Sequence, residues 1–425
     1  MAHNDHADTP LNKIISKFAI MPIPQIYLDN ASTTPTDPRV LKSMLPYFSE
    51  EYGNPESLHT KGKNALVAID NARETVAEIL NCRPSEIIFC GTATEANNLA
   101  ILGTARAFSL TIQAKSNTSQ PTSQSSSQTD KIHVITSLIE HSAVRNPFEQ
   151  LEKEGFSVTH VPSDKEGFIN PQDIEKAITS QTTLVSIMYA NNEIGTIEPI
   201  KEIGEICKKH NIPFHTDACQ AAAIDPLNVN ELNVSLLTLN GSKIYGPKGI
   251  GILYVKQGTK IEPIIHGGSH EKGLRAGTHN VPAIVGFATA FKILREEKEK
   301  GNAHLILLRN KLIEGILKTI PDTYLNGPSP SSNKRLPANA SITFKGINGQ
   351  ELLLQMDESG IYVSSGAACS EGTEKPSTTL CTIGLPQNLL HGTIRFSFGK
   401  QNTENDVEYV LKTLPEIVRK LRQRT

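Results

Sequence analysis

Apolar and polar blocks alternate through the middle of this 425-residue chain. Short runs rich in Val, Ile, Leu and Thr are separated by stretches in which apolar residues recur at helical spacing. Such alternation predicts a parallel sheet with helices on both faces. The strand-like runs read KIHVITS, FSVTHVP, TLVSIMYA and IPFHTDA, and the helices between them are expected to begin near residue 142, at PQDIEKAI and near residue 199.

A lysine lies between two apolar runs in the stretch TLNGSKIYGPKGIGILYV, residues 238–255. Glycines after Lys243 lead into the second run, so the stretch is predicted to form a strand, a loop and another strand. A partly desolvated amine at the mouth of a sheet loses its proton more readily and suits a Schiff base with an aldehyde. The alternative is a solvated lysine in a glycine-rich hairpin, and only the neighbours of Lys243 decide between the two.

Polar residues follow the predicted strands, at the edge where ligands bind in sheets of this kind. One strand, EIIFC, runs into TATEANN, where a helix start offers backbone N–H groups and the positive end of its dipole to a phosphate. Each feature taken singly has a plainer interpretation, such as a helix cap or a surface imidazole. The other strand-end candidates are His141, Asn192, Asp217, Gln220 and Lys243.

The pattern changes beyond about residue 285. A long charged helix, FKILREEKEKGNAHLILLRNKLIEGILKTI, precedes a Pro-, Ser- and Asn-rich joint and the strand-like segments ASITFKG, IYVSSG and TIRFSFG. This pattern predicts a smaller α+β domain. A stretch rich in Ser, Gln and Thr within the first domain is expected to be a disordered surface insertion. We therefore divide the chain into an N-terminal extension (1–24), a large domain (25–284) with an insertion at 112–130, and a small C-terminal domain (285–425).

The charge balance indicates a small bound partner. The chain has 42 basic and 44 acidic residues and a net charge of -2, so no electrostatic case exists for DNA or an acidic membrane surface. The apolar runs fall short of the roughly 18 residues that a membrane helix needs, and the N-terminus lacks the features of a signal peptide. A cytoplasmic location is expected.

The six cysteines show no metal-ligand spacing, so no metal site is expected. In a reducing compartment most are expected to be small buried hydrophobes. Cys369 differs because the surrounding stretch, SSGAACSEGTEKPS, is polar and has no apolar periodicity. A structural cysteine is the plainer interpretation, whereas a thiol in a polar loop can also serve as a travelling nucleophile.

The strand-end residues match the needs of pyridoxal phosphate. This cofactor requires a lysine for its aldehyde, a carboxylate for its ring nitrogen, donors for its phosphate and a flat partner for its ring. Lys243, Asp217 and His141 can supply the first, second and fourth of these, and the turn 92–94 with Ser242 can supply the third. The candidates for these four roles support one another because all of them fall at predicted strand ends.

Nine segments, which cover nearly all of residues 26–415, read in order YLDNASTTP, TATEANNLA, EHSAV, NNEIGTIEPI, HTDACQ, GSKIYGPKGIGILYV, HGGSHEKGLRAGT, SSGAACSEG and IRFSFG. Together they closely resemble the cysteine desulfurases of the NifS/IscS type, which are class V aminotransferase-family enzymes of PLP fold-type I. The resemblance implies an α/β fold whose large domain has a mainly parallel seven-stranded sheet between helices, next to the small domain.

The resemblance also implies roles for cofactor-binding residues. Lys243 would hold the cofactor as a Schiff base, and Asp217 would pair with its ring nitrogen. Gln220 would hydrogen-bond the ring oxygen, while His141 would stack on the ring and move protons. Thr278 would reach the phosphate of the other subunit, which implies a homodimer. The remaining cofactor-binding residues implied are Ala93, Thr94, Asn192, Asn240 and Ser242.

For the reaction, the resemblance implies conversion of L-cysteine to L-alanine. Asn192 and Arg395 would hold the substrate carboxylate, the arginine by a bidentate fork. Lys243 would take the Cα proton, and the thiolate of Cys369, in a loop at 364–377, would attack the substrate sulfur and keep it as a persulfide. A sulfur acceptor, such as a scaffold for iron-sulfur cluster assembly, would then receive it.

Two alternatives remain open at the level of sequence. One is a lyase with the same cofactor that acts on cystine, a cysteine sulfoxide or selenocysteine, in which Cys369 would be dispensable. The other is a non-catalytic sulfur-assembly scaffold, for which the sign is Ser242 in a position where the family usually has His.

Overall fold

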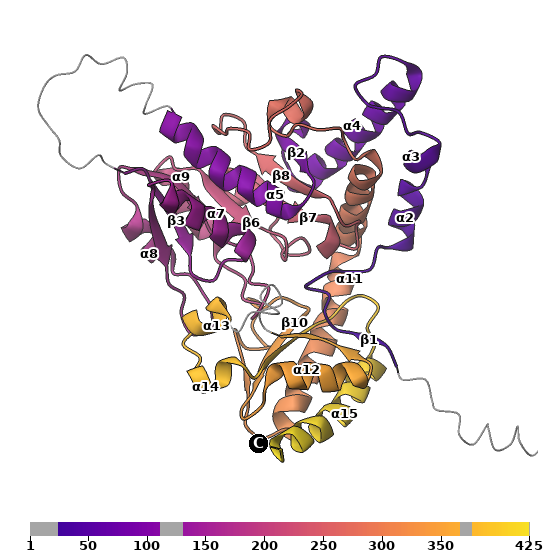
Figure 1. The fold of residues 1–425 in the computed structure, drawn as a ribbon, viewed down its shortest axis with the longest axis vertical. Coiled ribbons are helices and arrows are strands. Elements are labelled where there is room, and N and C mark those ends of the chain that lie inside the picture. Colours follow the sequence, from indigo (N-terminus) through magenta and orange to yellow (C-terminus); the bar gives the residue numbers. More distant parts are fainter. Residues whose placement is uncertain (1–23, 111–130, 366–375, 425) are drawn as a thin grey trace, which may run out of the picture.

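The computed structural model describes residues 24–110, 131–365 and 376–424 (Figure 1). Nearly all of the N-terminal extension, the insertion predicted at 112–130, and Cys369 lie outside the described residues. The predictions made for them therefore stay predictions.

A seven-stranded sheet forms the larger part of the molecule, in the order β2-β8-β7-β6-β5-β3-β4. Strand β8 runs antiparallel to both of its neighbours, and the remaining ladders are parallel. The predicted mainly parallel sheet is thus confirmed. Its strands are β2 Ile87–Cys90, β3 His133–Ser137, β4 Ser157–Val161, β5 Thr182–Ser186, β6 Phe214–Asp217, β7 Leu236–Asn240 and β8 Gly251–Val255.

Apolar side chains project from both faces of this sheet, because successive residues of a strand point to opposite sides. In β2, Ile87 and Phe89 belong to one core, and Ile88 and Cys90 to another. Helices α4 and α9 pack into the first core, and α5 and α7 into the second, so the sheet lies between two helical layers (Figure 1). The helices of this part are α4 Thr60–Leu80, α5 Ala93–Asn98 with its π-helical continuation Leu99–Gly103, α7 Ser142–Lys153, α8 Pro171–Ala177, α9 Ile200–Lys209 and α10 Val229–Leu232.

The C-terminal part has a core of its own around a four-stranded antiparallel sheet in the order β12-β13-β10-β9. Strand β1 pairs in parallel with β11 beside this core. Ile26 and Leu28 are therefore buried with the C-terminal part, whereas the sequence assigned residues from 25 onward to the large domain. The elements are β1 Ile26–Tyr27, β9 Thr323–Leu325, β10 Asn339–Phe344, β11 Ile361–Tyr362, β12 Ser364–Ser365, β13 Thr393–Ser397, α12 Gly349–Glu358 and α15 Glu404–Arg422.

Helix α11, Val281–Thr319, connects the two parts (Figure 1). Phe287 near its start belongs to the core of the large sheet, and Leu312 near its end belongs to the C-terminal core. The helix begins well before the charged stretch that predicted it, because the side chain of Asn280 caps it by accepting from the Ala283 N–H. The domain boundary predicted at 284 falls inside this continuous helix.

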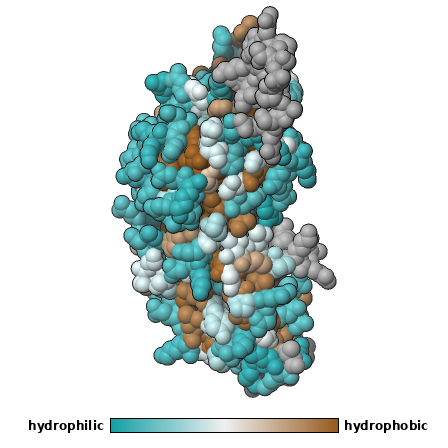
Figure 2. Space-filling view, turned by 90° about the vertical axis from the view of Figure 1, so that its left-hand side faces the viewer, coloured by the Kyte–Doolittle hydropathy of each residue, from teal (hydrophilic) through white to brown (hydrophobic). Residues whose placement is uncertain are grey.

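The remaining elements of the described chain are short. Its surface carries both hydrophilic and hydrophobic residues. Figure 2 shows a face on which hydrophilic residues predominate and hydrophobic ones gather in small patches. None of the helices in the described ranges combines the length and hydropathy of a membrane span. The short elements are α2 Pro38–Met44, α3 Pro46–Ser49, α13 Thr378–Thr382, α14 Gln387–Leu390 and the 3-10 segments η1 Pro84–Glu86, η3 Gly241–Lys243 and η4 His270–Gly273.

Candidate active site

A cavity of about 370 Å³ lies at the C-terminal ends of the parallel strands. This is the edge at which ligands bind in open α/β sheets, and the volume suits a small molecule. Both parts of the molecule contribute to its wall. The predicted site residues that line it are Ala93, Thr94, His141, Asn192, Asp217, Gln220, Asn240, Lys243 and Arg395.

Lys243 enters this cavity from the turn that follows β7. Its Nζ donates to the backbone oxygen of Ser32. The segment that carries Ser32 is held in place two residues later, where Thr34 donates its N–H to the Ser242 carbonyl at 2.9 Å and its hydroxyl accepts from the Tyr245 N–H at 2.8 Å. The amine is thus fixed between two chain segments more than 200 residues apart, in the wall of a cavity, and the prediction of a solvated hairpin lysine does not hold.

Asp217 is the last residue of β6, and each of its carboxylate oxygens accepts one hydrogen bond from the protein. Asn97 Nδ2 donates to Oδ2 at 2.7 Å, and the Cys219 N–H donates to Oδ1 at 3.0 Å. Asp217 is only 7% exposed. Hydrogen bonds to the charged form stabilise a buried carboxylate, so Asp217 is equipped to face a cationic ring nitrogen.

The start of α5 presents positive charge to the cavity, in contrast to the Asp217 carboxylate. Thr92 caps the helix by accepting the Glu95 N–H at 3.1 Å, and Ala93 and Thr94 of the first turn line the cavity. Gly251 of β8 packs so closely that a Cβ on it would lie 2.6 Å from the Ala93 nitrogen. The first turn therefore rests directly on the sheet, with the positive end of the helix dipole at the cavity.

His141 caps α7 through its ring. Nδ1 accepts the Ala143 N–H at 3.1 Å, so in the neutral ring the proton is on Nε2. The adjacent Glu140 is 4% exposed, and its Oε1 accepts from the Ser137 hydroxyl at 2.7 Å and the Met188 N–H at 2.9 Å. Burial raises the pKa of Glu140 to about 8.

Arg395 reaches the cavity from β13 of the C-terminal part and is 1% exposed. One nitrogen, Nη2, donates to Asp29 Oδ1 at 2.7 Å and to the Ser32 hydroxyl at 2.8 Å, and Nη1 donates to the Asn192 carbonyl at 3.2 Å. Nε is buried and has no hydrogen-bond partner among the described atoms. A buried cationic donor of this kind fits an anionic ligand that the cavity would hold.

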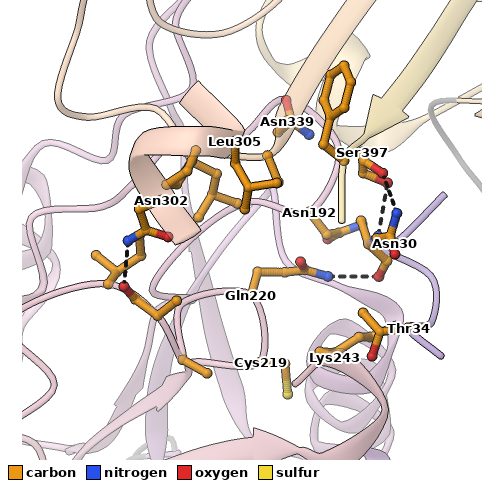
Figure 3. A pocket seen from close by; sticks show the side chains of 18 of the residues that line it. Asn30, Thr34, Asn192, Cys219, Gln220, Lys243, Asn302, Leu305, Asn339 and Ser397 are labelled. Atoms are coloured by element: carbon orange, nitrogen blue, oxygen red, sulfur yellow. Dashed lines mark hydrogen bonds between the residues drawn. The ribbon is translucent and has the colours of Figure 1, made fainter. Parts of the chain in front are cut away.

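A second pocket of about 110 Å³ adjoins the cavity between the two parts of the molecule (Figure 3). Asn192, Gln220 and Lys243 line both hollows. Gln220 Nε2 donates to the Ala31 carbonyl at 3.0 Å, which holds this side chain in the shared wall (Figure 3). The predicted hydrogen bond of Gln220 to the ring oxygen of the cofactor stays a prediction, made for a side chain that lines the cavity.

Three predicted residues are not brought to the cavity wall by the described chain. The Ser242 hydroxyl donates to Asn240 Oδ1 at 3.1 Å instead. Thr278 is exposed in the loop after η4, and Cys369 is not among the described residues. Their roles remain predictions, and for Ser242 the structure shows a bond within its own turn.

The side chains present fit pyridoxal phosphate. An amine, a hydrogen-bonded carboxylate, a helix start and an imidazole surround one cavity of suitable size, and these are the four groups that the cofactor needs. The unpaired Nε of Arg395 adds a donor for a substrate carboxylate. Nowhere in the described ranges do three or more His, Cys, Asp or Glu residues lie together as a metal site would require.

Sequence reasoning missed several residues that shape this site. Asn97 and Ser32 both lie within quoted motifs, TATEANNLA and YLDNASTTP, but neither received a role. Cys219 also lines the cavity. For Asn97 a usable signal existed, since a polar residue on the buried side of a helix start needs a hydrogen-bond partner.

Comparisons with known proteins agree with this geometry. The family model for class-V aminotransferases matches residues 26–410. A protein named cysteine desulfurase IscS from Clostridium botulinum is 46% identical over 399 residues, covering 94% of this chain and 96% of that protein. Another of that name from Methanosarcina thermophila is 45% identical and covers 93% of each chain.

Solved structures show the same likeness. A NifS-like protein has a TM-score of 0.83 and 37% identity, and the match covers 93% of this chain and 100% of that one. The structure described as SspA in complex with cysteine has a TM-score of 0.73 and 35% identity, with 89% of this chain and 100% of that chain covered.

Proposed function

Because the chain belongs to the class-V aminotransferase family, and the resemblance to the NifS/IscS type is confirmed along nearly its whole length, we propose that it is a pyridoxal phosphate-dependent cysteine desulfurase. The observation that carries the proposal is the convergence of Lys243, Asp217 and Arg395 on one cavity. An amine, a carboxylate and a guanidinium in that arrangement serve an amino-acid substrate.

The bound cofactor supplies the aldehyde and the electron sink. Lys243 would hold the aldehyde carbon until the substrate amine takes its place, and the amine so released would be the base for the Cα proton. Asp217, held by its two protein donors, would face the ring nitrogen as its hydrogen-bond and charge partner. His141, with its proton on Nε2 when neutral, stacks on the ring and moves protons. Backbone groups of Ala93 and Thr94 would bind the phosphate, and Ser242 would join them once its hydroxyl leaves Asn240. Asn240, which lines the cavity, would be a further cofactor contact.

The substrate carboxylate is bound by Arg395 and Asn192. Asp29 and Ser32 hold Nη2 of Arg395, so the guanidinium is already oriented before substrate arrives. The free Nε then donates to the carboxylate, which recovers the cost of leaving a buried donor unpaired. Preorganised charge of this kind favours binding because little reorganisation is needed.

Sulfur leaves the substrate by nucleophilic attack. The thiolate of Cys369 would attack the substrate sulfur, the bond from that sulfur to Cβ would break, and the sulfur would stay on Cys369 as a persulfide. The electron pair of the broken bond would pass to Cβ and the cofactor that serves as electron sink, and protons returned to Cβ and Cα would complete alanine. The rest of the substrate is released as L-alanine. A sulfur-acceptor protein, such as an iron-sulfur scaffold in the cytoplasm, takes the persulfide sulfur.

The enzyme works as a homodimer in which Thr278 reaches the phosphate of the other subunit. Exposed apolar side chains on α2, α3 and α4 and in the segments that join them support this, and Figure 1 shows these helices along one side of the molecule. Arg73 of α4 holds Glu271 of η4, the segment that precedes the loop with Thr278, by two bonds of 2.6 and 2.8 Å. The exposed set is Leu41, Leu45, Phe48, Tyr52, Leu58, Leu66 and Val67.

Mass spectrometry of Cys369 after addition of L-cysteine tests the proposal. We expect one extra sulfur on Cys369 and equimolar alanine. Replacing Cys369 by Ser should leave the visible absorbance of the bound cofactor intact and abolish sulfide release. Cys381→Ser, at an exposed cysteine of α13, is the matched control.

The competing activities give different results in the same experiment. Full turnover by Cys369→Ser would indicate a lyase that releases sulfur or selenium directly, especially if L-selenocysteine were the better substrate. A protein that binds no cofactor, or whose Lys243 is not labelled by borohydride reduction, would indicate a non-catalytic scaffold.

A further inference from the structure

The pocket of about 110 Å³ beside the cavity has no part in the proposed reaction. It lies between the large-sheet part and the C-terminal part, and helix α11 contributes Asn302 and Leu305 to its wall (Figure 3). A closed apolar cavity of about 150 Å³ holds a benzene molecule. The pocket therefore has room for roughly three or four carbon atoms.

The wall of this pocket is mainly apolar. Leu336 and Phe398 line it from the C-terminal part and Ala222 from the large-sheet part, and their exposed fractions are 6%, 2% and 3%. Among the described residues that line it, Lys243 is the only one with a charged side chain. A ligand gains free energy here by covering apolar surface, and a charged group would find no counterion.

Polar side chains of the wall are already hydrogen-bonded within the protein. The amide of Asn339 is used at both ends, since Nδ2 donates to the Glu193 carbonyl at 3.0 Å and Oδ1 accepts from Arg335 at 3.2 Å. A polar ligand group would thus lose its water without gaining equivalent partners. The other lining side chains that are bonded in this way are Asn30, Thr34, Asn302 and Ser397.

The pocket and the cavity meet at the residues proposed to hold the head group of an amino acid. The substrate amine would take the place of Lys243, and Asn192 would contact the carboxylate together with Arg395. Lys243 and Asn192 line both hollows, so the Cα between amine and carboxylate lies at their boundary. The residues that line both hollows are Ala31, Asn192, Cys219, Gln220 and Lys243.

From this geometry we propose that the pocket binds the apolar side chain of an α-amino acid. Amino acids with unbranched side chains of three or four carbon atoms would bind there and compete with L-cysteine. The inference rests on the proposed function, because it needs the head group to be held at Lys243 and Arg395. The methyl group of L-alanine ends at the boundary, whereas the side chains of L-norvaline and L-norleucine extend into the pocket.

Titration of the full-length holoenzyme with a series of L-amino acids, followed by the visible absorbance of the cofactor, tests the proposal. Each buried methylene improves binding up to about fourfold. The dissociation constant of L-norvaline should therefore be about tenfold below that of L-alanine, after the ordering of the side chain is counted. L-Homoserine, with the same number of side-chain heavy atoms as L-norvaline, should bind no more tightly than L-alanine, because its hydroxyl would be desolvated without an equivalent partner.

Two variants change the volume of the pocket in opposite directions. Ala223→Leu fills it, so L-norvaline should lose its advantage while the dissociation constant of L-alanine stays the same. Leu305→Ala enlarges it, so L-norleucine should gain affinity relative to L-norvaline. Ala303→Leu and Leu307→Ala, at exposed positions of α11, are the matched controls and should behave as wild type.

Equal dissociation constants along the amino-acid series would overturn the inference. So would an advantage of L-norvaline that survives in Ala223→Leu and is unchanged in Leu305→Ala. If neither L-alanine nor L-cysteine alters the spectrum, the proposed function fails and the inference with it. A spectrum that responds to L-alanine but not to chain length removes the inference alone.

Xenon supplies a readout that needs neither cofactor nor substrate. Crystals of the full-length protein without cofactor, held under xenon pressure, should show a xenon atom in the pocket, because xenon occupies apolar cavities. The same treatment of Ala223→Leu should leave the pocket without xenon. A wild-type pocket that takes up no xenon would overturn the inference.

Discussion

The side-chain amide of Asn97 donates a 2.7 Å hydrogen bond to Oδ2 of Asp217, and both residues are buried. A carboxylate only accepts, so the NH₂ group of Asn97 must face it. The other amide atom, Oδ1, is then buried without a partner among the described atoms. A buried polar atom without a partner is unfavourable, so the contact with Asp217 is the reason for an asparagine at this position.

Replacing Asn97 by Leu should weaken cofactor binding, because the Asp217 carboxylate loses one of the two donors that hold it. A hydrogen bond to a charged group contributes about 1.5–3 kcal/mol, so we expect cofactor affinity to fall about tenfold or more. Titration of the cofactor-free protein with pyridoxal phosphate, followed by visible absorbance, measures the effect. Asn98→Leu, at a neighbour whose side chain donates to the Thr94 carbonyl, should behave as wild type. Identical titrations for wild type and Asn97→Leu would contradict the role.

Arg395→Lys should weaken substrate binding while leaving the cofactor in place. Lysine keeps the positive charge but loses the planar fork and the Nε donor. A loss of about 2 kcal/mol corresponds to roughly a 30-fold increase in the dissociation constant of L-alanine, measured from the cofactor absorbance. Arg39→Lys, at a surface arginine paired with Glu297 at 2.6 Å, is the control. An unchanged dissociation constant would place the substrate carboxylate elsewhere.

Phe48→Glu should convert the proposed dimer to monomers. Phe48 is 61% exposed in the apolar set on α2, α3 and α4, and a buried unpaired charge in an interface is costly. Sedimentation equilibrium should report a lower mass for Phe48→Glu than for wild type. Leu354→Glu, at a leucine of α12 that is 60% exposed, tests whether any exposed apolar side chain has this effect. Dissociation by both variants, or by neither, would argue against the interface.

The parts of the fold that could be predicted from the sequence are those in which local pattern and tertiary packing agree. The apolar runs of β3 and β5 became strands because both of their faces are covered by helices. The predicted helices near residues 142 and 199 are α7 and α9. The site residues that follow the strands were also predictable, because the C-terminal ends of parallel strands lie at one edge of the sheet.

What could not be predicted depends on contacts between distant segments. Arg395 meets Asp29 across 366 residues of sequence, and no local pattern indicates that pair. Helix α11 crosses the predicted domain boundary because one long helix contributes to two cores. Ser242 was predicted to bind phosphate because it lies beside Lys243. Its hydroxyl instead donates to Asn240, because both residues lie in the same turn.

Glu140 should make the stability of the protein depend on pH. Its pKa is raised from 4.5 to about 8, chiefly by burial and with a smaller contribution from the charge of Asp217, which His141 opposes. Between pH 4.5 and about 8 the folded protein keeps the Glu140 proton, whereas the unfolded chain releases it. The contribution of Glu140 to the free energy of unfolding is therefore complete below about pH 4.5 and is lost as the pH rises toward 8. For one carboxyl the slope approaches about 1.4 kcal/mol per pH unit.

Glu140→Gln, which keeps an acceptor for Ser137 and Met188, should remove that share of the slope and be more stable than wild type at alkaline pH. Urea unfolding of the cofactor-free protein at a series of pH values measures this, with Glu149→Gln, an exposed position on α7, as the control. An equal slope in wild type and Glu140→Gln would mean that Glu140 is already ionised in the folded protein.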